Sequence, residues 1–237
     1  MKAVLLAAGL GTRLRPITLT TPKCLVPFDD IPLLEIWLRQ FEAAGISEVL
    51  VNLHHFPEQV QAFVDGRRGR IRVSTVLEET LLGSLGTLVN NRKFYENEDE
   101  LFVAYADNLV AARQANLVEV HSRHDLPLTM AVFQTNTPSQ CGIVESDEHG
   151  VVHSFVEKPE HPASDLANGG LYVLDTSILL DIEDDGTRPL DIGFHLLPKL
   201  IGRMVAVPYG GYLQDVGTLE RYESAQRYFR EHHGEFI

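Results

Sequence analysis

The amino-acid sequence predicts a mixed α/β fold with a mainly parallel sheet and a hairpin-rich insertion. Up to Phe133, short apolar runs alternate with amphipathic segments of helical period. A glycine-rich loop directly follows the first apolar run, and open α/β sheets bind their ligands at such strand ends. After Thr135 the pattern changes to short strands separated by turn residues, which is typical of hairpins.

The elements of the first part follow from these patterns in order. Strands are predicted at 2–7, 48–53, 71–77, 102–105 and 129–133, and helices at 33–44, 57–64 and 116–123. Gly45 has the position of a C-cap after the first helix, and Pro57 has that of a first helical residue. Residues 82–87 contain two glycines and are predicted to form a loop.

In the second part, strands are predicted at 142–145, 151–157, 171–174 and 204–207, and helices at 190–200 and 218–229. The turn residues 147–150 indicate a hairpin, and Thr218 has the position of an N-cap for the last helix. Because the sequence contains no repeat, low-complexity run or linker, it is predicted to form a single domain over residues 1–237.

The composition is that of an ordinary globular protein, with 44% hydrophobic and 22% charged residues. The formal net charge of -13 argues against a nucleic-acid partner, which needs clustered basic residues. No apolar run reaches the roughly 18 to 20 residues of a membrane span, and Met1 leads into a strand rather than a signal peptide. A cytoplasmic protein without a membrane partner is therefore expected. Cys24 and Cys141 lack metal-ligand spacing and are interpreted as reduced thiols.

The loop after the first strand says most about function. Residues 7–16 read AAGLGTRLRP, and the first 28 residues carry cations but no Asp or Glu. Glycines let the backbone approach a ligand closely, and Arg13, Arg15 and Lys23 suit a phosphate-bearing ligand such as a triphosphate. The loop is not a dinucleotide-binding fingerprint, because Leu14 stands where the third glycine would be, and no Gly-Lys-Ser/Thr of a Walker A loop follows.

Two separated acids, Asp107 and Asp215, each lie at the end of a predicted strand, and Lys158 follows Glu157. Two carboxylates plus substrate phosphates are a plausible site for Mg²⁺. Taken singly, each aspartate also fits a turn or helix cap, and Lys158 fits a solvated charge. Together with the cationic loop, they indicate phosphoryl-type transfer.

At this point the sequence resembles the sugar-1-phosphate nucleotidyltransferases, also called nucleoside-diphosphate-sugar pyrophosphorylases. The motifs that carry the resemblance are TRLRP at 12–16, PK at 22–23, LGSLG at 82–86, Asp107, FVEKP at 155–159, NGGLY at 168–172 and DVGT at 215–218. They run in the family's order over nearly the whole chain. The resemblance implies a Rossmann-like three-layer fold with a nucleotide-binding part at about 1–110, a sugar-binding part at about 111–215 and a C-terminal helix at about 218–229.

The implied reaction is Mg²⁺-dependent transfer of a nucleotidyl group from a nucleoside triphosphate to a sugar 1-phosphate, which gives an NDP-sugar and pyrophosphate. The resemblance implies catalytic roles for Arg13, Lys23 and Asp107, and metal binding by Asp107 and Asp215. The implied nucleotide-binding residues are Leu6, Ala7, Ala8, Gly9, Gly11, Thr12, Arg13, Lys23, Glu79, Gly83 and Gly86. The implied sugar-phosphate residues are Gly142, Glu157, Lys158 and Asn168.

The base and the sugar stay open. Glu78 or Glu79 could accept from guanine, which favours GTP with a mannose- or heptose-type sugar, while the loop equally suits UTP or dTTP. A cytidylyltransferase acting on a non-sugar phosphate and a non-catalytic nucleotide-sugar-binding homologue are the alternatives. A pure binder has no need of the pyrophosphate clamp and both metal acids, which argues against the last of these.

The sequence departs from the family's pattern in three places. Ala106 stands where Gly usually precedes the first metal-site acid, and Cys24 replaces the common Pro after Lys23. No regulatory or acyltransferase arm follows the last helix, so a short single-domain form without allostery through such an arm is expected. Residues 230–237 are interpreted as a tail or as part of a homodimer interface.

Overall fold

The computed structural model describes residues 1–111, 114–183 and 186–236, apart from the side chains of Gln114 and Ala115. These residues divide into two compact units. Unit 1 comprises Met1–Leu81, Tyr105–Gln114 and Gly211–Ile237, and unit 2 comprises Leu82–Ala104 and Ala115–Gly210. Residues 82–104 belong to unit 2, and the C-terminal segment from Gly211 belongs to unit 1.

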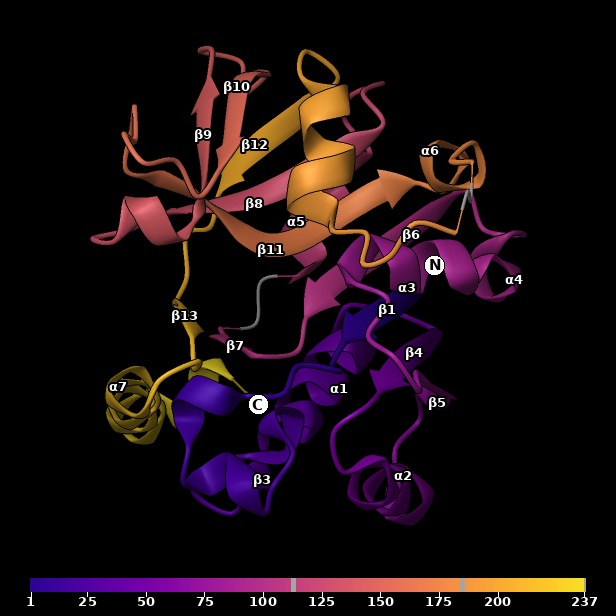
Figure 1. Cartoon of the computed structure of the whole chain (residues 1–237), viewed down its shortest axis with the longest axis vertical. Helices are drawn as coiled ribbons and strands as arrows, with labels where there is room; N and C mark the ends of the chain where they lie inside the picture. Colours follow the sequence, from indigo (N-terminus) through magenta and orange to yellow (C-terminus); the bar gives the residue numbers. More distant parts are fainter. Residues whose placement is uncertain (112–113, 184–185, 237) are drawn as a thin grey trace. The chain divides into compact units, whose positions relative to one another are not determined.

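Unit 1 contains three parallel strands side by side in the order β1-β4-β5 (Figure 1). Their bounds are Lys2–Leu6 for β1, Glu48–Leu53 for β4 and Arg72–Leu77 for β5. Register runs from Lys2 opposite Glu48, and from Glu48 opposite Arg72. β1 and β4 are almost wholly buried, because their apolar runs are covered on both faces.

The remaining elements of unit 1 are helices and short ribbons. The helices are α1 (Leu33–Ala43), α2 (Pro57–Gly66) and α7 (Leu219–Glu231), and the ribbons are β2 (Pro27–Phe28) with β3 (Ile31–Pro32) and β7 (Asn108–Val110) with β13 (Leu213–Asp215). Gly45 takes a φ of 77° two residues after the end of α1, and the Thr218 hydroxyl accepts from the Arg221 amide at the start of α7. Thr218 is thus the predicted N-cap of α7, whereas the C-cap of α1 is Ala44, one residue before the predicted Gly45.

Unit 2 is mainly antiparallel. Its strands are β6 (Glu100–Tyr105), β8 (Leu128–Gln134), β9 (Gly142–Ser146), β10 (Val152–Glu157), β11 (Leu166–Asp175) and β12 (Met204–Pro208). β11 pairs antiparallel with β6, β8 and β9, β9 and β10 form the predicted hairpin, and β12 is parallel to β8 (Figure 1). The helices are α3 (Ser84–Asn90), α4 (Arg92–Tyr95), α5 (Gln114–His121) and α6 (Ser177–Leu180).

Two sequence predictions need correction. Residues 82–87 do not form a loop throughout, because α3 begins at Ser84; the amides of Leu85 and Gly86 donate to the carbonyl of Leu190, which satisfies donors that a first helical turn leaves unpaired. Residues 190–200 do not form a regular α-helix. A π-helical turn over Ile192–Leu196 precedes a 3-10 turn over Leu197–Leu200, since Pro198 has no amide to continue an α-helix.

Each unit has its own aromatic core. Fully buried rings are Phe28, Trp37, Phe41, Phe229 and Phe236 in unit 1, and Tyr95, Phe102 and Tyr172 in unit 2. Among the described residues, no helix has both the length and the apolar character to cross a membrane.

Candidate active site

In unit 1, a two-stranded ribbon brings together Asp107 and Asp215, here called the acid pair. Asp215 ends β13 and lies opposite Asn108 of β7, and the Val216 amide donates to the Asp107 carbonyl at 3.0 Å. The indole N–H of Trp37 in α1 donates to the Asn108 carbonyl at 2.9 Å. Helix α1 thus supports the strand that carries the first acid.

Lys23 lies between the two carboxylates of the acid pair. Its Nζ donates to Asp107 Oδ2 at 2.6 Å and to Asp215 Oδ1 at 3.3 Å, and the residue is 6% exposed. Burial lowers the pKa of Lys23, but the charges and hydrogen bonds of the two carboxylates together raise it above its ordinary value. The side chain is therefore an ammonium held between two carboxylates.

The other Asp215 oxygen is held by a residue that the sequence did not single out. Arg221 in the first turns of α7 donates from Nη1 to Asp215 Oδ2 at 2.8 Å. Gly217 keeps this region open, because a Cβ there would lie 2.8 Å from Asp215 Oδ1 and 3.2 Å from Arg13 Nη2. Arg13 therefore approaches the acid pair. The only signal for Arg221 in the sequence is its place six residues after the second acid.

Most of the predicted nucleotide-binding residues of unit 1 end β1 or form the loop after it. These are Leu6, Ala7, Ala8, Gly9, Gly11, Thr12 and Arg13. Gly11 has a φ of 60°, and a Cβ there would lie 2.8 Å from Thr18 Cγ2. The Thr18 hydroxyl donates to the Gly11 carbonyl at 2.6 Å. The loop is thus a tightly folded turn that requires glycine at this position.

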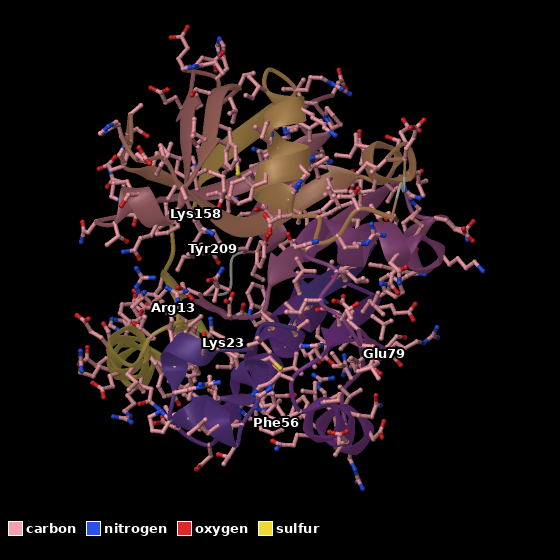
Figure 2. All side chains as sticks on the ribbon, viewed as in Figure 1. Arg13, Lys23, Phe56, Glu79, Lys158 and Tyr209 are labelled. Atoms are coloured by element: carbon pink, nitrogen blue, oxygen red, sulfur yellow. The ribbon has the colours of Figure 1, made fainter. Side chains whose placement is uncertain are left out.

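A buried polar network adjoins this loop, and it includes only one of the two candidate glutamates, Glu78 and Glu79. The Ala7 amide donates to Asn52 Oδ1 at 2.6 Å, and Asn52 Nδ2 donates to Glu78 Oε1 at 2.9 Å. Glu78 is 4% exposed, whereas Glu79 is exposed and lies away from Arg13 and Lys23 in the view of Figure 2. The carboxylate beside the loop is therefore that of Glu78.

Gly83 and Gly86, the two remaining predicted nucleotide-binding residues, lie in unit 2. Gly83 has a φ of 80°, and a Cβ there would collide with the carbonyl of Leu190. A Cβ on Gly86 would lie 3.1 Å from the side chain of Leu82. Close packing within unit 2 therefore explains why both positions are glycine.

In unit 2, the carboxylate of Glu157 lies against two glycines. Gly142 begins β9 opposite Glu157, the last residue of β10, and a Cβ on Gly142 would lie 2.6 Å from Glu157 Oε2. A Cβ on Gly193 would collide with the same oxygen. Lys158 has a φ of 49°, and the Nζ of its exposed side chain lies 3.7 Å from Glu157 Oε1 and 5.9 Å from the ring centre of Phe194.

Two further polar groups interact electrostatically with Glu157. Tyr172, whose hydroxyl accepts from Asn168 Nδ2 at 2.6 Å, has a raised pKa because it is buried; Glu157 and Asp191 also raise it. The Asp191 carboxylate accepts from the Gly193 amide at 2.9 Å and from the Ser84 hydroxyl at 3.1 Å, and so fixes the turn that carries Gly193. Sequence reasoning missed Asp191 and Ser84, which lie 107 positions apart.

Burial raises the pKa of Glu157, Lys158 lowers it, and Asp191 raises it, with a net shift upward. The site of unit 2 thus combines acceptors that suit sugar hydroxyls with one exposed cation that suits a phosphate.

The residues of unit 1 fit a divalent cation. Asp107 Oδ2 and Asp215 Oδ1 already converge on one cationic atom, Lys23 Nζ. No group of three or more His, Cys, Asp or Glu side chains suited to a metal occurs in the described part of the chain. Two carboxylates suit Mg²⁺, which commonly takes its other ligands from substrate phosphates and water. Ala106 and Cys24, which depart from the family's pattern, are both buried, and Lys23 donates to Asp107 beside them.

Comparisons with known proteins identify the family of the chain. The family described as nucleotidyl transferase matches residues 2–232. The mannose-1-phosphate guanylyltransferase catalytic subunit beta of Xenopus tropicalis is 33% identical over 226 residues, which cover 92% of this chain and 61% of that protein. The chain therefore spans less than two thirds of this relative's length.

Solved structures show the same fold. The UDP-glucose pyrophosphorylase from Acinetobacter baumanii matches with a TM-score of 0.84 at 22% identity, covering 99% of this chain and 95% of that one. HddC from Yersinia pseudotuberculosis, complexed with GMP-PN, matches with a TM-score of 0.79 at 24% identity, covering 96% and 99%. These likenesses confirm the predicted α/β nucleotidyltransferase fold.

Proposed function

The chain belongs to the nucleotidyl transferase family, and we propose that it transfers a nucleotidyl group from a nucleoside triphosphate to a sugar 1-phosphate. In this reaction a phosphate oxygen of the sugar 1-phosphate attacks the α-phosphorus. The bond from the α-phosphorus to the bridging oxygen breaks, and pyrophosphate leaves with the electron pair. The observation that carries the proposal is the cluster of Lys23, Asp107 and Asp215, which lies beside the Gly11 turn, since a Cβ on Gly11 would come within 3.3 Å of Lys23 Cβ.

The proposed roles in unit 1 are those of charge neutralisation and positioning. Arg13 holds the departing pyrophosphate with its planar fork of donors, and Lys23 serves as a point charge for the α-phosphate and the attacking group. Asp107 and Asp215 would hold Mg²⁺, which when bound neutralises charge on the phosphates. Backbone and small side chains from Leu6 to Thr12 leave room for the nucleotide.

The proposed roles in unit 2 concern the sugar phosphate. Glu157 accepts hydrogen bonds from sugar hydroxyls, and Gly142 and Gly193 leave room for its carboxylate. Lys158 binds the phosphate, because its Nζ is exposed and carries a positive charge. Asn168 is oriented by Tyr172 and Gly170 and presents its amide to the sugar.

For the base we propose guanine, and for the sugar a manno-configured one. Glu78 rather than Glu79 supports this choice, since its buried carboxylate accepts from Asn52, the residue that holds the Ala7 amide. A carboxylate can accept from the N1–H and amino group of guanine, which uracil and thymine do not offer in that pattern. The guanylyltransferase relative gives the same indication.

The test is a matrix of triphosphates and sugar 1-phosphates with Mg²⁺, read as release of pyrophosphate. GTP with mannose 1-phosphate or a heptose 1-phosphate should react fastest, and no release is expected when the sugar phosphate is omitted. A matrix without any turnover, or nucleotide binding alone, would instead favour the non-catalytic homologue. Release with CTP and a non-sugar phosphate would favour the cytidylyltransferase.

Variants of the acid pair test the proposed chemistry. Asp107→Asn and Asp215→Asn should each lower kcat by roughly a hundredfold or more, because charge stabilisation at the phosphates is lost. Asp30→Asn is the matched control, since Asp30 is an exposed aspartate of the same unit. Wild-type rates in both acid-pair variants would contradict the two-carboxylate metal site.

A further inference from the structure

The acid pair and Lys23 form a site that is already filled by a cation. Nζ of Lys23 lies 2.6 Å from Asp107 Oδ2 and 3.3 Å from Asp215 Oδ1, and only 7% of the lysine side chain is exposed. These are the two carboxylates that are proposed to hold the metal. An ion that bridges the same two oxygens would meet the ammonium there.

The charges of this cluster are balanced without a metal. Asp215 has a separate cationic partner on each oxygen, Lys23 on Oδ1 and Arg221 on Oδ2. The two carboxylates thus face Lys23 and Arg221, and Arg13 lies nearby as a third cation, so a divalent ion entering alone would add two positive charges to a group whose acids are already fully compensated. Coulomb repulsion from Lys23 at such short range opposes that entry.

The two cations of the cluster differ in what they block. Arg221 comes from α7 and donates to Asp215 Oδ2, whereas Lys23 donates to the other oxygen, Oδ1. Arg221 can keep Asp215 oriented whether or not a metal is present. Lys23 occupies the point on which the acid pair converges, and has to move before a metal can bridge it.

We infer that Lys23 and the divalent cation are alternative occupants of the acid pair, with Arg221 as a positioning residue for Asp215. In the nucleotide-free protein, Lys23 holds the two carboxylates together and keeps free metal out. A triphosphate supplies phosphate oxygens for the ammonium as well as ligands for the metal, so the metal enters together with the nucleotide. The role of the triphosphate rests on the proposed function, whereas the exclusion of free metal does not.

Binding of Mn²⁺ to the nucleotide-free protein tests the inference without turnover. Free Mn²⁺ is followed by its electron paramagnetic resonance signal in wild type, Lys23→Gln, Lys23→Met and Lys2→Met. Both Lys23 variants should bind Mn²⁺ roughly tenfold or more tightly than wild type, because a unit charge is removed a few ångströms from the ion. Lys2→Met is the matched control, since Lys2 pairs with Glu48 and should leave the affinity unchanged.

Arg221→Met distinguishes two explanations for tighter Mn²⁺ binding, namely that Lys23 and the metal occupy the same position, or that the net charge of the cluster has changed. It removes the same charge as Lys23→Met but leaves the ammonium in place, so its gain in affinity should be much smaller. An equal gain in the two variants, or no gain in the Lys23 variants, would overturn the inference. A gain in Lys23→Gln that disappears in the double variant with Asp107→Asn would place the ion on the acid pair.

Thermal unfolding supplies a second measurement, because the Lys23 variants leave two carboxylates facing each other. Mg²⁺ should raise the Tm of Lys23→Gln more than that of wild type. Variants that fold only with Mg²⁺ would also support the inference, whereas variants that neither Mg²⁺ nor Mn²⁺ restores would contradict it. If these results hold while the substrate matrix stays silent, only the proposed function fails.

Discussion

At the scale of single residues, Gly193 shows how a missing side chain shapes the site of unit 2. We expect Gly193→Ala to push the Glu157 carboxylate aside, since a Cβ would collide with Oε2. The KM for the sugar 1-phosphate should rise roughly tenfold because binding groups are misplaced, and the free energy of unfolding should fall by about 1–3 kcal/mol from overpacking. Steady-state kinetics and urea unfolding measure the two effects.

Gly210→Ala is the control for this variant, because nothing lies within 4 Å of a Cβ at Gly210 in the same unit. It should match wild type in both measurements. An unchanged KM in Gly193→Ala would show that Glu157 does not need its observed position for sugar binding.

The raised pKa of Glu157 predicts a pH dependence of substrate binding. Burial, and to a lesser degree Asp191, hold this pKa above the ordinary value of a glutamate. As the pH falls through the raised value, Glu157 gains a proton and loses its capacity as a pure acceptor, so the KM for the sugar 1-phosphate should rise. Asp191→Asn removes a negative charge and should move this acid limb to lower pH. A limb that stays in place would contradict the assignment.

The raised pKa of Glu157 has the opposite effect on stability: a higher pH favours substrate binding but lowers the free energy of unfolding. A carboxyl group whose pKa is raised by folding favours the folded state below its unfolded pKa, and this contribution is lost as the pH rises through the raised value. The free energy of unfolding should therefore fall over this range, and less so in Glu157→Gln. Urea unfolding at several pH values measures the difference.

At the scale of elements, helix α1 acts as a brace for the short strand β7. Besides Trp37, it contributes Gln40, which is 3% exposed and donates from Nε2 to the carbonyls of Val110 at 2.8 Å and Phe236 at 3.3 Å. Gln40→Met should lower the free energy of unfolding by about 1–3 kcal/mol, because buried carbonyls lose a donor. Gln59→Met is the control, since Gln59 donates to Thr20 at an exposed position. Equal losses in the two variants would contradict the brace.

Elements with a clear apolar period could be predicted from the sequence, and elements defined by distant partners could not. β1, β4 and α1 can be predicted from local apolar patterns, and their apolar residues are buried in the structure. β7 has only three residues, and its pairing depends on β13 about a hundred positions later. The helix α3 was missed because its first amides are satisfied by Leu190 rather than by a local cap.

The same physical limit applies to the candidate site. The positions of Lys23, Asp107 and Asp215 at loop and strand ends in the sequence predict phosphate and metal chemistry. The contacts of Arg221 with Asp215, and of Asp191 with Ser84, depend on tertiary folding and leave no local pattern. Glu78 and Glu79 are neighbours of identical type, and only burial distinguishes them.

At the scale of the whole molecule, the chain passes between the two units several times, and unit 1 is assembled from three segments. The last segment brings Phe229 and Phe236, both fully buried, and the acid Asp215. A chain shortened to end at Gly210 should therefore lose the folded state of unit 1. Hydrogen exchange should show fast-exchanging amides in β1, β4 and β5, and native protection there would contradict the expectation.

Trp37 gives the protein an intrinsic fluorescence signal close to the acid pair. It is the single tryptophan of the sequence, and its indole N–H donates to Asn108, the residue after Asp107. Its fluorescence therefore reports on the backbone that carries the first acid, without any added dye. Mn²⁺ is a paramagnetic quencher, so emission should fall when Mn²⁺ and GTP are added together and change little with Mn²⁺ alone. Loss of quenching in Asp107→Asn would identify the acid pair as the source of the signal.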